Sequence, residues 1–173
     1  KVNASVSPTF DIEYIFLKIR GKSVGETTEV GVICPDDKVT RVSIKVNFDD
    51  ISVLTSDDHS NEIQITENVK LNLRYPVMSD MKGLKSQDAV KTPFKVLGRC
   101  IHSIQFGDDV YNKVDISEKE IEDFIDELTA EQFEKVMDFF NSMPKVRHIV
   151  DVINPKTKVK SEVVLEGLQS FLA

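Results

Sequence analysis

The strongest hydrophobic pattern lies in residues 115–143 and predicts two consecutive helices. Apolar residues recur three and four positions apart there, which places one apolar stripe on each helix. The two stripes are Ile121, Phe124, Ile125 and Leu128, and then Phe133, Val136, Met137 and Phe140. Ser117 and Thr129 each stand three residues before an acid or amide, the spacing of a capping box. We therefore predict a central helical hairpin at about 117–143, closed by Pro144, in which the two stripes share one apolar seam.

Elsewhere apolar and polar residues alternate, and this period of two predicts three antiparallel β-hairpins. The expected hairpins cover residues 26–48, residues 63–73, and residues 146–154 with 159–167. A short strand is expected at 51–53, and residues 55–61 should form a loop because turn-forming residues dominate there.

The remaining segments predict shorter helical elements. Ser7 and Pro8 resemble an N-cap and a first helical position, so a helix should begin there and end at Gly21. Its wide apolar arc predicts burial on more than one side. A second helix is expected at about 88–102, a short strand at 104–106, and an apolar turn at the C-terminal end.

These elements together predict an α+β protein in which antiparallel β-hairpins alternate with helices. The 173 residues suit one compact domain over 1–173, with a subdivision near 76–90 as the alternative. Because the chain opens at Lys1 and not at methionine, we expect that an N-terminal segment is missing.

The composition and net charge of the chain disfavour some classes of binding partner. Hydrophobic residues make up 40% and charged residues 29% of the chain, which is typical of a folded protein. The formal charge of −7 disfavours nucleic acid and anionic membranes as partners, because both require neutralisation of phosphate groups by cations. Two cysteines far apart in the sequence indicate a reducing compartment.

Candidate chemistry is sparse, and we predict no catalytic, cofactor or metal site. Cys34 lies in a turn that resembles half of a zinc knuckle, but no second pair of ligands follows downstream. A buried cysteine at the end of a strand is the simpler interpretation. His59, His102 and His148 lie in three different elements, and a structural role is the default for each. A triad assembled in space stays open as the alternative.

Two surfaces are candidates for protein contacts. Nine acids and one base lie between Asp115 and Glu134. They form either a solvated helix face or a docking surface for a basic partner, with Glu122 and Asp126 as the candidate contact residues. The C-terminal residues Leu168, Phe171 and Leu172 either pack on the protein's own core or anchor a partner.

Three segments together resemble a known family. Residues 11–26 read DIEYIFLKIRGKSVGE, and VICPDD follows at 32–37. Residues 133–173 combine a helix, a Met-Pro stop, a hairpin with an Asn-Pro turn, Glu-Gly-Leu and a terminal Phe. In this order they resemble the baseplate hub subunits and hub assembly proteins of T4-like contractile-tailed phages. Some relatives have a paired-cysteine knuckle where this chain has Cys-Pro-Asp-Asp, a departure that removes any inference of a metal.

The resemblance implies a role without catalysis. Such proteins help build the central hub of the tail baseplate, either as a structural component or as an assembly chaperone that leaves before the virion is mature. Expected partners are other hub or tail proteins, with a homo-oligomer also open. The expected location is the tail baseplate of the virion, and the host cytoplasm during assembly. A tail-associated hydrolase is a third and weaker hypothesis.

Overall fold

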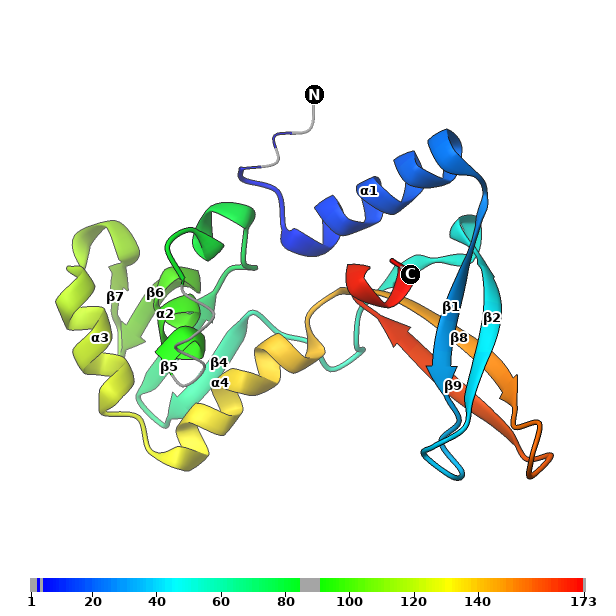
Figure 1. Ribbon diagram of the computed structural model, residues 1–173. Helices are drawn as coiled ribbons and strands as arrows, with labels where there is room; N and C mark the ends of the chain where they lie inside the picture. Colours follow the sequence, from blue (N-terminus) through cyan, green and yellow to red (C-terminus); the bar gives the residue numbers. More distant parts are fainter. Residues whose placement is uncertain (1–2, 4, 85–90, 173) are drawn as a thin grey trace. The chain divides into compact units, whose positions relative to one another are not determined.

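The computed structural model describes residue 3, residues 5–84 and residues 91–172, and it confirms the predicted α+β class. The fold consists of two compact units, and the chain passes between them three times (Figure 1). Unit 1 comprises Lys1–Thr9 and Ser56–Met143, and unit 2 comprises Phe10–Thr55 and Pro144–Ala173. The subdivision expected near 76–90 falls inside unit 1, so the observed boundaries lie elsewhere.

Unit 1 contains a four-stranded antiparallel sheet in the order β4-β5-β6-β7. Its strands are β4 (Glu62–Thr66), β5 (Val69–Leu73), β6 (Ile101–Phe106) and β7 (Asp109–Asn112). The first two form the predicted second hairpin. Strand β7 was not predicted, because its four residues are all exposed and therefore lack the alternation that marks a half-buried strand.

Helices α2 (Lys91–Cys100), α3 (Glu118–Asp126) and α4 (Ala130–Ser142) pack with this sheet, and short 3-10 helices η2 (Met78–Met81) and η3 (Lys113–Asp115) connect the elements. The core combines sheet residues such as Leu71 and Ile104 with helix residues such as Leu97, Ile125 and Val136. The helix expected at 88–102 is confirmed from residue 91 onwards, and its first positions lie outside the described residues.

Both predicted capping boxes are present. The hydroxyl of Ser117 accepts a hydrogen bond from the amide of Glu120, and Thr129 does the same with Gln132. The predicted shared seam is corrected, because α3 packs mainly on α2, and α4 mainly on β4, more than they pack on each other. Gly98 allows the first contact, since an added Cβ there would lie 3.2 Å from Ile121.

Unit 2 contains two antiparallel sheets, one of β1-β2 and one of β3-β8-β9. The strands are β1 (Thr27–Ile33), β2 (Arg41–Asn47), β3 (Ser52–Leu54), β8 (Lys145–Ile153) and β9 (Lys160–Glu166), which confirms the first and third predicted hairpins and the short strand between them. Helix α1 (Thr9–Val24) and the 3-10 helices η1 (Phe48–Asp50) and η4 (Leu168–Phe171) complete the unit. The core joins α1, both sheets and η4 through residues such as Leu17, Val146 and Phe171.

Three expectations for α1 are wrong. Pro8 is not its first residue but pairs with Val77 in an isolated β-bridge. Gly21 does not end the helix. It is buried, and an added Cβ would lie 3.1 Å from the Cβ of Phe48, so the glycine permits a close helix contact. Nor is α1 buried on more than one side, because Phe16 and Ile19 are exposed.

Candidate interaction surfaces

The turns of the two hairpins in unit 2 share one hydrogen-bond pattern at their start, although the first turn is one residue longer. The first turn follows Cys34-Pro35 and the second follows Asn154-Pro155. In each, the amide of a lysine with a positive φ, Lys38 or Lys158, donates to the carbonyl four residues earlier, that of Cys34 or Asn154. Cys34 and Asn154 therefore occupy equivalent buried positions.

Hydrogen bonds join these two turns into what we call the tip clasp, formed by Asp36, Asn154 and Thr157. Asn154 Nδ2 donates to both carboxylate oxygens of Asp36 at 3.0 and 3.1 Å, and Thr157 Oγ1 also donates to that carboxylate. The hydrogen bonds from Thr157 and Asn154 lower the pKa of Asp36. The clasp thus holds together two turns that lie more than 100 residues apart in the sequence.

The clasp accounts for the position that resembled half of a zinc knuckle. Among the described residues, no three His, Cys, Asp or Glu side chains come together in a way that could hold a metal ion. Burial raises the pKa of the Cys34 thiol, which therefore behaves as a small apolar group at the end of β1. The Cys-Pro and Asn-Pro dipeptides are the sequence signal for these two turns, but nothing in the sequence shows that the turns meet.

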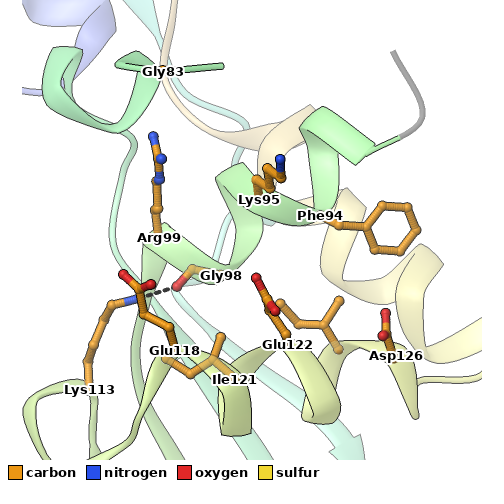
Figure 2. A pocket seen from close by; sticks show the side chains of 11 residues that line it. Gly83, Phe94, Lys95, Gly98, Arg99, Lys113, Glu118, Ile121, Glu122 and Asp126 are labelled. Carbon is orange, nitrogen blue, oxygen red and sulfur yellow. Dashed lines mark hydrogen bonds between the residues drawn. The ribbon is translucent and has the colours of Figure 1, made fainter. Parts of the chain in front are cut away.

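The predicted acidic surface borders a pocket in unit 1. Figure 2 shows Glu118, Glu122 and Asp126 along one side of α3, facing residues of α2 and η3. The pocket measures about 570 Å³ and is also lined by three cations, which are Lys95, Arg99 and Lys113. The surface that sequence alone described as acidic is therefore of mixed charge.

Two of these cations hold the backbone in place. Lys113 Nζ donates to the carbonyl of Gly98, and Arg99 donates to the carbonyls of Asp80 and Lys82, the latter at 2.8 Å. Burial lowers the pKa of Lys113. The cations thus fasten η2 and η3 to the end of α2, and Glu122 and Asp126 remain exposed beside them.

An ion pair between Arg74 and Asp80 stabilises the segment around η2. Arg74 donates to both carboxylate oxygens of Asp80 at 2.8 Å, and the amide of Val77 donates to Asp80 as well. Burial alone would raise the pKa of Asp80, but the hydrogen bonds and charge of Arg74 outweigh it and the pKa is lowered. Because Asp80 is buried and Arg74 is fixed by it, this pair positions the chain around η2.

His59 lies in the predicted loop at 55–61 and is partly buried. Its ring stacks on Tyr75 with centroids 5.6 Å apart and contacts Phe139 at 5.2 Å. Its Nδ1 lies 2.9 Å from the hydroxyl of Ser142, which itself donates to the carbonyl of Asp138. Nδ1 therefore carries the proton, and the buried Nε2 has no hydrogen-bond partner among the described residues. Burial lowers the pKa of His59.

The structure places the other candidate residues as follows. His102 is exposed on β6, and His148 is partly buried on β8. Phe171 is fully buried in the core of unit 2, and Leu168 packs against that core. Of the two alternatives for the C-terminal turn, packing on the protein's own core accounts for Phe171. A contact between Leu172 and a partner stays a prediction.

Comparison with known proteins bears on the whole chain. The model of one protein family, described as T4 bacteriophage base plate protein, matches residues 1–173. The chain belongs to this base plate family. No curated protein and no solved structure matches it significantly.

Family membership gives the protein a structural or assembly role in a phage base plate. It also indicates contacts with other base plate proteins at the virion tail. None of the helices among the described residues is long and apolar enough to cross a membrane.

Proposed function

We propose that this base plate protein is a component of the central hub and that it acts through protein–protein contacts without catalysing a reaction. The observation that carries the proposal is the family match over residues 1–173. The hub assignment rests on the segments 11–26 and 133–173, whose order of elements resembles hub subunits and hub assembly proteins.

The described side chains fit a role in contacts. Residues that carry chemistry in other proteins have structural partners here, as with His59 in its aromatic stack and Asp36 in the tip clasp. In contrast, several large apolar side chains are exposed in both units. They include Phe16, Ile19, Ile149 and Val164 in unit 2, and Phe106, Tyr111 and Val114 in unit 1. Contiguous exposed apolar groups are typical of surfaces that other proteins cover.

Chemical cross-linking of isolated base plates, followed by mass spectrometry, tests the hub assignment. We expect lysines of this chain to cross-link to proteins of the central hub. Cross-links confined to peripheral base plate proteins would reject the hub position while leaving the base plate role intact.

The second candidate is an assembly chaperone that binds hub proteins and then leaves. The exposed acids of α3 favour it, because such a face can shield a basic partner surface during assembly. Quantitative mass spectrometry of purified virions separates the two roles. Stoichiometric amounts of the chain support the structural component, and its absence from virions combined with its presence in assembly intermediates supports the chaperone.

The hydrolase hypothesis can be tested at the pocket beside α3, because three carboxylates line it. Its three acids lie in a single row on one helix, spaced four residues apart, and all are exposed. Glycoside hydrolysis needs two carboxylates that flank the scissile bond from opposite sides, which one row does not provide. We expect the purified chain to release no fragments from peptidoglycan. Release that disappears in the Glu122→Gln variant would contradict the non-enzymatic proposal.

A further inference from the structure

Helix α1 carries two apolar stripes, of which one is buried and the other is half-buried at Ile12 and Ile15 and exposed at Phe16 and Ile19. The inner stripe, with Phe10, Leu17 and Gly21, is buried in unit 2. The outer stripe lies on the opposite side of the helix and recurs three and four residues apart. It consists of Ile12, Ile15, Phe16 and Ile19. Phe16 is 45% and Ile19 is 59% exposed, so the stripe offers large apolar side chains to a partner.

Charged residues border the outer stripe in an ordered way. At 3.6 residues per turn, Asp11 and Lys22 lie along one border, and Glu13 and Arg20 lie along the other. On both borders the acid stands in the first half of the helix and the base in the second half. The sequence of α1 therefore has opposite charges at the two ends of one apolar stripe.

We propose that α1 pairs with α1 of a second copy of this chain, antiparallel and about a two-fold axis. The centre of the stripe lies between Ile15 and Phe16. Antiparallel pairing about that centre sets Ile12 against Ile19 of the second copy, so that the two stripes cover each other. A two-fold interface uses the same patch on both copies, and each contact occurs twice.

The charges select the second copy and the direction of pairing. Antiparallel pairing joins like borders, so Asp11 meets Lys22 of the second copy. On the other border Arg20 faces Glu13 of the second copy, whose half-buried carboxylate also accepts a hydrogen bond from the backbone of Leu168. Parallel pairing of the same stripes would place acids beside acids and bases beside bases, which is repulsive. The patch is thus complementary to itself in one orientation only.

A shallow hollow beside the stripe suits this arrangement. It measures about 360 Å³, and its lining includes Tyr14, Ile15 and Ile19. Lys18 lies near the border of Asp11 and Lys22. Its Nζ donates to the carbonyl of Phe48 at 2.8 Å and forms an ion pair with Asp49. The residues that line the hollow all belong to α1, so it is an open depression that a second copy would cover, and the exposed Lys22 at its edge stays available for Asp11 of that copy.

Sedimentation equilibrium of the purified full chain tests the pairing. Because the stripe is short, we expect a dimer that dissociates on dilution, with a dissociation constant on the order of 1 μM to 1 mM. Ile19→Asp places a charge within the stripe, against Ile12 of the second copy, and should weaken dimerisation about tenfold or more. Val114→Asp is the matched control, since Val114 is 90% exposed in unit 1 and should leave dimerisation unchanged.

Two results would overturn the proposal. One is a monomer at all concentrations up to about 1 mM, which would leave the stripe to another base plate protein. The other is a dimer that Ile19→Asp does not weaken while circular dichroism shows it folded, which would place the interface elsewhere.

Charge exchange tests the antiparallel orientation separately. Asp11→Lys and Lys22→Asp should each weaken the dimer several-fold, because each sets like charges together. The double variant should recover most of the loss, since the opposite charges meet again with their places exchanged. Failure of the double variant to recover, with both single variants weakened, would contradict the antiparallel orientation.

Discussion

At the residue scale, single polar groups hold segments that are distant in the sequence. Asn154 is fully buried, yet each of its side-chain atoms has a partner. Its Oδ1 accepts from the amides of Lys156 and Thr157, and its Nδ2 donates to Asp36. Buried polar groups stabilise a fold when all their hydrogen bonds are made and destabilise it when one partner is removed.

We predict that Asn154→Ala destabilises the protein, because the turn amides lose their acceptor and the tip clasp opens. The expected loss is about 1–3 kcal/mol in the free energy of unfolding. Urea denaturation followed by circular dichroism measures it. Asn141→Ala is the control, since Asn141 is exposed at the end of α4. Equal effects of both substitutions would show that the clasp does not stabilise the fold.

His59 gives a prediction about pH. Its pKa is lowered in the folded protein because the ring is buried, so the unfolded chain binds a proton more readily. Stability should therefore fall as the pH decreases below about 6.5, the ordinary pKa of histidine. Urea denaturation at a series of pH values should show this fall. It should be smaller in His59→Phe and unchanged in His102→Gln, which alters an exposed histidine. An identical pH dependence in all three proteins would refute the role of His59.

At the scale of elements, local signals predicted the helices of unit 1 well. The hydroxyls of Ser117 and Thr129 satisfy free amides of the first turn, an interaction within four residues that sequence spacing reveals. The packing partners of those helices were not predicted. Contact between Gly98 and Ile121, like that between Gly21 and Phe48, depends on where the chain returns in space. Gly21 was predicted to end a helix, whereas both glycines lie inside helices at points of close packing.

Removal of the N-terminal cap of α4 should lower the stability of the protein. We predict that Thr129→Ala lowers the free energy of unfolding by about 1 kcal/mol, because the amide of Gln132 loses its acceptor. Thr129→Ser keeps the hydroxyl and should be nearly neutral in the same urea titration. A loss in the serine variant as large as in the alanine variant would mean that the methyl group, and not the cap, is responsible.

The C-terminal turn η4 allows a direct test of its packing role. We predict that Phe171→Ala destabilises the protein by about 3–5 kcal/mol, the usual cost of removing a buried aromatic ring. Thermal unfolding monitored by circular dichroism measures the shift. Leu172→Ala, at a half-buried neighbour, should cost much less. An unchanged melting temperature for Phe171→Ala would return this residue to the set of candidate partner contacts.

At the scale of the whole molecule, the chain alternates between two units. Each unit is therefore formed by two segments that are distant in the sequence. Hydrophobic periodicity identified most strands and helices, because each pattern is local. It did not predict the division into two units, since that depends on which strands pair and on contacts such as β3 with β8. The tip clasp was not predicted from the sequence for the same reason. Its residues carry no chemical motif until the fold brings the two turns together.

The central claim is that this chain works by presenting surfaces to other base plate proteins. Affinity purification of the tagged full chain from infected cells, followed by quantitative mass spectrometry, tests it most directly. We predict that other base plate proteins are recovered with it, at amounts well above those obtained with an untagged control. Recovery of the chain without any base plate protein, at every stage of infection, would contradict the account.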